Sequence, residues 1–261
     1  MNTLNTLLTT AIATATLSLA AGTASAATLL ALGADGQLFK VDSDSLKVTA
    51  TMPASSPSPL RGIDVRPANG MLYALGSDNQ LYTLDLTSGA ASKVASLNKQ
   101  LPGSAQAVVD FNPVADKLRL LAADGTSFRV NVETGEVVVD GSVAYAAEGP
   151  YAGKSAQVVA GAYSNAYAGT KATALYNVDL ASSSLMQQNP PNDGIQQVVG
   201  KIADGLKAAA LDIHSDGKGG NTAYLLTGTT LHSLDLATGK PTTLGEVAGL
   251  PGTVIDIAVL P

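Results

Sequence analysis

The chain has 261 residues, of which 15 are Lys or Arg and 21 are Asp or Glu, so its formal net charge is −6. It contains no Cys, which excludes disulfide bonds, thiolate metal sites and a Cys nucleophile. Its basic residues are few and scattered, which argues against nucleic acid as a partner, because a phosphate backbone is bound by clustered Lys and Arg. A hydrophobic content of 46% is too high for an intrinsically disordered chain.

Residues 1–26 have the pattern of a secretory signal peptide. The apolar stretch from Leu7 to Ala21 is shorter than the ~20 residues that a membrane-spanning helix needs. It is followed by Ala24-Ser25-Ala26, the small-x-small sequence that signal peptidase accepts, although no Lys or Arg precedes it. We therefore expect cleavage between Ala26 and Ala27 and a periplasmic or secreted protein. The alternative is an uncleaved N-terminal segment on a cytoplasmic protein.

The rest of the chain contains an internal repeat of short strands that alternate apolar and polar residues. A strand pair at 72–76 and 80–86 recurs at 29–33 with 37–42, at 118–121 with 127–131, and at 223–227 with 231–235. Another strand with a central Asp precedes three of these pairs, at 62–65, 108–111 and 210–213. Similar strands occur at 159–163, where Ala162 takes the place of the Asp, and at 254–259.

The repeat predicts an all-β fold, a five-bladed β-propeller made of the single domain 27–261. The Asp positions 64, 110, 212 and 256, with Ala162 in the same place, follow one another at intervals close to the ~40–50 residues of a four-stranded blade. The first unit lacks an inner strand, and a spare one lies at the C-terminus. We therefore predict that the C-terminal strand pairs into the first blade and closes the ring. A β-sandwich or an open stack of sheets is the alternative, since both also contain short strands separated by frequent turns.

Turn residues support this assignment. Gly89, Gly135 and Gly239 each follow an Asp or Asn by four residues, which predicts tight hairpins with a positive-φ Gly and an Asx side chain bonded to the turn. Pro190 and Pro191 are expected at an edge or turn, because proline cannot donate to a central ladder.

Four aspartates, Asp64, Asp110, Asp212 and Asp256, occupy corresponding positions in the predicted inner strands. The inner strands of a propeller line its central channel, where carboxylates could hold Ca²⁺ or another hard cation through oxygen ligands. Alternatively, each Asp bonds the backbone of a neighbouring blade or caps its own turn. Recurrence in several repeats favours this structural role, because an architecture repeats whereas an active site usually does not.

The two histidines give weaker signals. His214 lies two residues after Asp212 and could reach the channel or a loop. His232 occupies the repeat position of Tyr82 and Phe128, where we expect it to pack. The chain contains no nucleophile-elbow, metalloprotease or phosphate-loop signature, so no catalytic residue is assigned.

Four of the eight tyrosines, Tyr145, Tyr151, Tyr163 and Tyr167, are clustered in the sequence near Gly and Pro residues that indicate loops. Tyrosines on loops of a rigid scaffold often form binding surfaces. These four are therefore the candidate ligand-binding residues, and simple packing between the third and fourth blades is the alternative.

Several motifs together resemble a known bacterial family. They are Arg61–Pro67, Leu72–Gly76, Asp110–Pro113 with Asp116–Arg119, and Pro190–Gly194. In combination they are similar to the family described as domain of unknown function 4394, over nearly all of the chain after residue 26. The resemblance implies a secreted bacterial β-rich domain with no established activity, and it supplies no catalytic residues.

These observations favour an exported, non-enzymatic propeller that acts as a monomeric binding or scaffold module for a small molecule or a protein. No cofactor is expected, with Ca²⁺ as the exception if the aspartates bind it. The alternative is a metal-assisted hydrolase or lactonase that uses the aspartate-lined channel and His214. A surface protein that assembles with itself is a third possibility.

Overall fold

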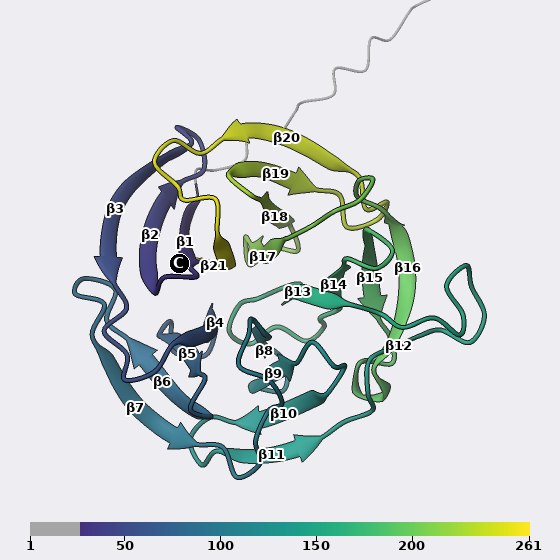
Figure 1. The fold of residues 1–261 in the computed structure, drawn as a ribbon, viewed down its shortest axis with the longest axis horizontal. Helices are drawn as coiled ribbons and strands as arrows, with labels where there is room; N and C mark the ends of the chain where they lie inside the picture. The colour runs from purple at the N-terminus through teal and green to yellow at the C-terminus, as the bar shows by residue number, and fades with distance from the viewer. Residues whose placement is uncertain (1–26) are drawn as a thin grey trace, which may run out of the picture.

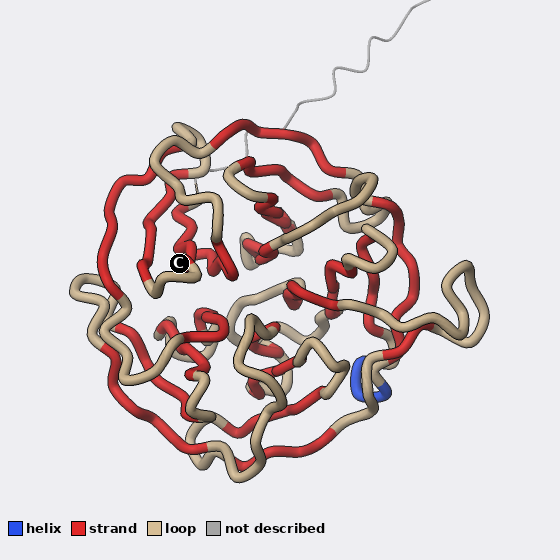
Figure 2. The backbone as a smooth tube through the Cα atoms, viewed as in Figure 1, coloured by secondary structure: helices blue, strands red, loops and turns tan. Residues whose placement is uncertain are grey.

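The computed structural model describes residues 27–261, which form five small sheets around a central axis (Figure 1). The described residues are strands and loops apart from one short 3₁₀ segment, η1 (Pro191–Asp193), drawn in blue in Figure 2. The five-bladed β-propeller predicted from the repeat is confirmed. The predicted signal peptide lies outside the described residues. Within the described part, none of the helical structure has the length and apolarity needed to cross a membrane.

Each blade runs from an inner strand at the axis to an outer strand at the rim. Blade 1 contains β21 (Val254–Val259), β1 (Thr28–Gly33), β2 (Gln37–Asp42) and β3 (Lys47–Pro53). Blade 2 contains β4 (Leu60–Val65), β5 (Leu72–Gly76), β6 (Gln80–Leu84) and β7 (Ala91–Ser96). Blade 3 contains β8 (Val108–Asn112), β9 (Lys117–Leu121), β10 (Ser127–Asn131) and β11 (Glu136–Val139).

Blade 4 has one strand more than the other four blades. Blade 4 contains β13 (Val158–Tyr163), β14 (Leu175–Asp179), β15 (Ser184–Gln188), β16 (Ile195–Lys201) and a fifth strand at the rim, β12 (Ala144–Tyr145). Blade 5 contains β17 (Ala210–Ser215), β18 (Asn221–Thr227), β19 (Thr230–Leu234) and β20 (Pro241–Glu246). Strand β12, which pairs in parallel with β16, was not predicted, because two residues are too few to show a periodic pattern.

The C-terminal strand closes the ring as predicted. Strand β21 pairs antiparallel with β1, so the last strand of the chain is the inner strand of the first blade (Figure 1). The contact continues beyond the ladder, where the Leu260 N–H donates to the Thr28 carbonyl at 2.8 Å. Because the described fold has no open end, no blade exposes an unpaired face to water.

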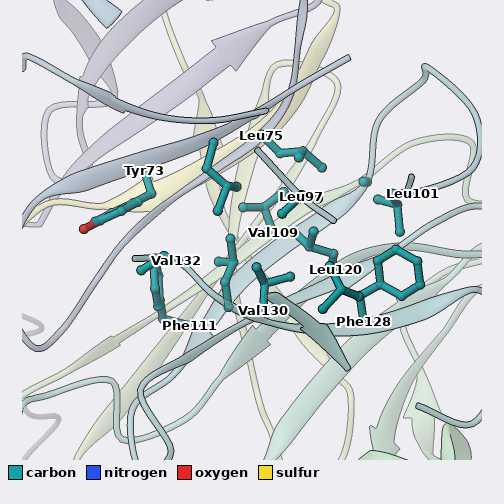
Figure 3. Packing of buried hydrophobic residues seen from close by; sticks show 14 of the residues in the cluster. Tyr73, Leu75, Leu97, Leu101, Val109, Phe111, Leu120, Phe128, Val130 and Val132 are labelled. Carbon is teal, nitrogen blue, oxygen red and sulfur yellow. The ribbon is translucent and has the colours of Figure 1, made fainter. Parts of the chain in front are cut away.

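The hydrophobic core lies between the blades rather than inside one layer. The largest cluster joins blades 2 and 3, and Tyr73 packs edge-on against Phe111 with ring centroids 5.1 Å apart (Figure 3). All five residues of β5 are buried, because both faces of this strand are covered by neighbouring blades. This explains why the middle strands read as nearly continuous apolar runs, and each large side chain so buried contributes about 1.5–3 kcal/mol.

The predicted Asx–Gly turns are confirmed, and they serve a second purpose. Gly135 has a φ of 74°, and the Asn131 side chain accepts a bond from the Glu133 N–H at 3.1 Å. A Cβ atom on Gly135 would lie 2.0 Å from the carbonyl oxygen of Ser96, on the outer strand of the preceding blade. The glycine therefore permits both the turn and the close approach of one blade to the next.

The two prolines lie in the turn between β15 and β16, as expected. The following residue, Asn192, accepts hydrogen bonds from the Arg119 guanidinium at 3.0 Å and, through its carbonyl, from the Gly141 N–H at 2.9 Å. This turn thus fastens the rim of blade 4 to blade 3.

Candidate functional site

The inner strands place three aspartates at one level of the channel. Asp64 pairs with Tyr73, Asp110 with Arg119 and Asp212 with Tyr224, each on the second strand of its blade. In blade 4 the corresponding residue is Ala162, opposite Tyr176. These positions agree with the repeat found in the sequence.

Asp256 does not occupy the corresponding position in blade 1. Leu30 is the counterpart of Tyr73 in blade 1, because Leu30 pairs with Lys40 on the third strand as Tyr73 pairs with Thr83. The partner of Leu30 on the inner strand β21 is Ala258. Asp256 lies two residues earlier, opposite Leu32. The expectation of four equivalent aspartates is therefore wrong for Asp256, because the register of β21 against β1 is shifted by two residues relative to the sequence repeat.

Each of the four carboxylates bonds the backbone of a neighbouring blade. The acceptor–donor pairs are Asp64 with the Phe111 N–H (2.7 Å), Asp110 with Tyr163 (2.9 Å), Asp212 with Val259 (2.5 Å) and Asp256 with Ile63 (2.8 Å). The structural role favoured by the repeat is thus present at four of the five contacts between adjacent inner strands.

The fifth contact, between blades 4 and 5, is held differently because Ala162 has no carboxylate. The Gln106 amide, from the loop before β8, donates to the carbonyls of Val159 (2.8 Å) and Ala209 (3.3 Å). At the other end of these strands, the Asn165 N–H donates to the Asn221 side chain at 2.8 Å. Side-chain amides therefore replace the carboxylate at this contact.

The aspartates form a cluster of buried acids. Oxygens of Asp64, Asp110 and Asp212 all lie within 4.8 Å of one another, whereas Asp256 is not part of this group. Burial, together with the neighbouring carboxylates, raises the pKa of Asp64 and Asp110 well above the ordinary value, against the opposing effect of their backbone hydrogen bonds. Burial also raises the pKa of Asp212 to about 6.

A pocket of about 260 Å³ opens onto this cluster at one end of the channel. Asp64, Asp110, Asp212, His214 and Tyr167 are among its lining residues, and no Lys or Arg of the described chain lines it. Both carboxylate oxygens of Asp64 and of Asp212 accept a backbone N–H.

Asp110 differs from the other two acids in one respect. Its Oδ1 accepts the Tyr163 N–H, but its Oδ2 accepts no hydrogen bond from the described residues. The Asp110 residue is only 5% exposed, so this oxygen belongs to a nearly buried side chain that lines the pocket. This oxygen is not one of the buried side-chain atoms without a partner, so it is open to the pocket, where water or a cation can contact it.

The four candidate tyrosines fall into three places. Tyr163 is buried and its hydroxyl accepts a bond from Arg119 at 3.3 Å, so it packs between blades 3 and 4. Tyr167 lines the channel pocket. Tyr145 and Tyr151 lie together at the rim of blade 4, with ring centroids 5.3 Å apart.

The histidines also separate. His232 lies between the hydroxyls of Thr227 (2.9 Å) and Thr243 (3.1 Å), and burial lowers its pKa. Its packing at the repeat position of Tyr82 is as predicted. His214 lines the channel pocket, beside residues that sequence reasoning did not single out. These are Pro67, Gly70 and Leu260, which loop ends bring to the axis.

Solved structures of other proteins resemble the described fold. A solved structural genomics protein of unknown function from Bacteroides thetaiotaomicron matches with a TM-score of 0.56 and 18% identity, over 90% of this chain and 65% of its own. A protein of unknown function from Bacteroides caccae matches with a TM-score of 0.46 and 10% identity, over 90% of this chain and 99% of its own. At such identities the first similarity shows the fold alone.

No curated protein matches the sequence. The family model described as "Domain of unknown function (DUF4394)" matches residues 37–258, a range that includes the candidate aspartates and the strands β2 to β20. The resemblance seen in the sequence motifs is therefore confirmed, and the chain belongs to the DUF4394 family.

Proposed function

We propose that this protein is an exported, non-enzymatic binding module that holds a cationic ligand at the mouth of its channel. The observation that carries the proposal is the unbonded Oδ2 of Asp110, which lies in a pocket shared with Asp64 and Asp212. A cation there would offset the mutual repulsion of the three carboxylates and compensate for their burial.

A hard divalent cation such as Ca²⁺ is the ligand whose coordination best matches these residues. Ca²⁺ takes six to eight oxygen ligands at about 2.3–2.6 Å. The three carboxylates present oxygens within 4.8 Å of one another, which is close enough for one ion to contact all three. The pocket of about 260 Å³ has room for waters that would complete the shell, and equally for an organic ammonium group.

Calcium titration of the protein 27–261 tests this proposal. We expect Ca²⁺ to release or absorb heat in calorimetry and to raise the Tm, and we expect D110N to abolish both effects. Asparagine keeps the oxygen that accepts the Tyr163 N–H and removes the charge, so the fold should survive. Parallel titrations with Mg²⁺ and with spermidine distinguish a metal site from an ammonium site.

The matched control is D256N, which neutralises a buried channel aspartate outside the group of three. This variant should keep the Ca²⁺ response of the parent. If none of the three cations gives heat or a Tm shift, or if D110N responds like the parent protein, the channel is not a cation site.

A metal-assisted hydrolase or lactonase is the second candidate, and the presence of His214 in the same pocket favours it. A carboxylate-bound metal could activate a water, and a neutral imidazole could accept its proton. Ester and lactone hydrolysis, measured with and without Ca²⁺ or Zn²⁺, tests this function. Activity that H214A removes while Ca²⁺ binding persists would support it.

We propose export with cleavage after Ala26, which rests on the signal-peptide pattern of residues 1–26. Ala27 itself is buried, and its N–H donates to the Ser43 hydroxyl at 2.9 Å. Fractionation of an expressing bacterium followed by intact-mass measurement should find a chain that begins at Ala27. A cytoplasmic chain that retains residues 1–26 would contradict export.

We also expect the exported protein to be a monomer, and light scattering measures its mass in solution.

A further inference from the structure

A loop at the rim of blade 4 is anchored more firmly than a simple connection requires. Residues 146–157 project beyond the ring between β12 and β13 (Figure 1). Both ends bond the same carboxylate, because Asp179 accepts the Tyr145 hydroxyl at 2.6 Å and the Gln157 N–H at 2.5 Å. Asp179 is fully buried and also accepts two bonds from Ser182. Compact loops whose ends are held together in this way are often functional.

Although the loop projects beyond the ring, its Tyr151 side chain packs against Tyr145 of the blade. The Tyr151 ring lies 5.3 Å from the Tyr145 ring at an angle of 38°, and the Lys154 ammonium lies 5.7 Å from the centre of Tyr151. The backbone of the loop is turned at Gly153, which has a φ of 75°, and the Lys154 N–H donates to the Tyr151 carbonyl at 3.0 Å. The position of Tyr151 is thus fixed from within the loop.

A pocket of about 310 Å³ lies between this loop and β16. We call it the rim pocket. Its lining combines apolar with polar residues, among them Tyr145, Glu148, Pro150 and Tyr151 from the loop and its base, and Gln197 and Val198 from β16. Val198 is 40% exposed although it lies in a strand, which leaves an uncovered apolar surface in the pocket. Among the described residues, no Arg or Lys lines the rim pocket, so an anion would find no charged partner there.

The polar groups of the rim pocket that remain free are mostly hydrogen-bond acceptors. The Gln196 amide is already used within the blade, since its nitrogen donates to Gln188 at 2.8 Å and its oxygen accepts from Asn177 at 3.0 Å. Gln197 donates to the Asn189 carbonyl, which leaves its amide oxygen free. Within the described chain, the Glu148 carboxylate and the Tyr151 hydroxyl make no hydrogen bond. The pocket therefore suits a ligand rich in hydroxyl donors.

We infer that the rim pocket binds a neutral saccharide. The apolar C–H face of a sugar ring would pack against Tyr145, Pro150 and Val198, while its hydroxyls would donate to Glu148 and Gln197. Pockets of this mixed kind, with an apolar wall and a few convergent polar groups, are typical of small-molecule sites. A cationic ligand is disfavoured because Lys154 already supplies a cation to the Tyr151 ring. This site is independent of the channel pocket.

Titration of the protein 27–261 with neutral trisaccharides tests the inference. The probes are maltotriose, cellotriose, xylotriose and N-acetylchitotriose, with trigalacturonate and spermidine as charged comparisons. We expect at least one neutral trisaccharide to bind in calorimetry and in saturation-transfer NMR. We expect E148Q to weaken that binding about tenfold, because it removes a charge-assisted hydrogen bond worth about 1.4 kcal/mol.

A matched pair of substitutions locates the binding. V198R fills the rim pocket, and V138R changes a comparably exposed valine on the outer strand of blade 3, 48% exposed against 40% for Val198. The first should abolish binding and the second should leave it unchanged, with the same Tm in both. Binding that survives V198R, binding lost in D110N, or binding of only the charged probes would overturn the inference, as would the absence of any binding at millimolar concentrations.

Discussion

A chain that ends at residue 251 is expected to lose cooperative unfolding. The deletion removes β21, which supplies the inner strand of the first blade and pairs along the length of β1. Ile257 belongs to the core between blades 5 and 1, and Ala258 belongs to the core between blades 1 and 2. Two neighbouring cores are therefore opened at once.

The deletion also removes two of the four aspartate bonds between blades. These are the bond from the Ile63 N–H to Asp256 and the bond from the Val259 N–H to Asp212. Because the chain has no Cys, no covalent link replaces them. The lost burial alone, at about 1.5–3 kcal/mol for each large apolar side chain, approaches the roughly 5–15 kcal/mol by which domains are stable.

Calorimetry and urea unfolding measure this effect. The parent chain should show one sharp transition, and the truncated chain a broad one at lower temperature with a smaller enthalpy. A chain that ends at residue 259 keeps β21 and is the matched control. A truncated protein that melts as sharply and as high as the parent would show that closure by β21 does not hold the ring.

The metal-free protein is expected to be less stable at pH 7.5 than at pH 5. The folded state raises the pKa of Asp64, Asp110 and Asp212 above the ordinary value of 3.8, chiefly through burial. A group whose pKa is raised on folding stabilises the protein fully below its unfolded pKa and loses that contribution as the pH rises through its folded pKa. For Asp212 this range extends from about 4 to about 6.

Urea unfolding in EDTA at several pH values measures this loss, which should be about 1–3 kcal/mol between pH 5 and pH 7.5. At lower pH, the free energy of unfolding is expected to fall as the pH falls. Hydrogen bonds from Ser88 and from Arg66 lower the pKa of Asp85 and of Asp116, respectively, and their contributions disappear when these carboxyls are protonated. A stability that stays constant or rises from pH 5 to pH 7.5 would contradict the raised pKa values.

Two substitutions of Asp110 separate its charge from its hydrogen bond. D110N should raise stability at pH 7.5 and flatten the pH dependence, because it removes one of three buried charges and keeps an acceptor for the Tyr163 N–H. D110A leaves this buried N–H without a partner and should cost about 1–3 kcal/mol. D204N changes an almost fully exposed carboxylate that pairs with Lys201, and it should leave the pH dependence of the parent unchanged between pH 5 and pH 7.5.

Most of the architecture could be predicted because its signals are local and repeated. Gly135 and the other turn glycines lie four residues after an Asx, and that spacing alone specifies a hairpin. Recurrence of the inner-strand pattern at five places then predicts five blades, and the missing inner strand of the first unit predicts closure by the last. The position of Ala162 at the level of the aspartates also followed from the repeat.

The residues that meet at each site could not be predicted, because they come together through contacts between distant parts of the chain. Strand β21 pairs with a strand more than 200 residues away, so no hairpin fixes its register, and Asp256 lies two residues from the position that the repeat indicated. The loop between β13 and β14 brings Tyr167 to the pocket of Asp64, Asp110 and Asp212, whereas His214 lies on β17 itself, two residues after Asp212. The short strand β12 and the loop anchored on Asp179 form the rim pocket.

The kind of sheet, the number of blades and the closure of the ring could therefore be predicted from the sequence, because alternation and turn chemistry act over a few residues. The three-carboxylate pocket and the rim pocket depend on strand register and on contacts between distant loops. Such contacts leave no periodic signal in the chain, and they arise only when the blades pack around the axis.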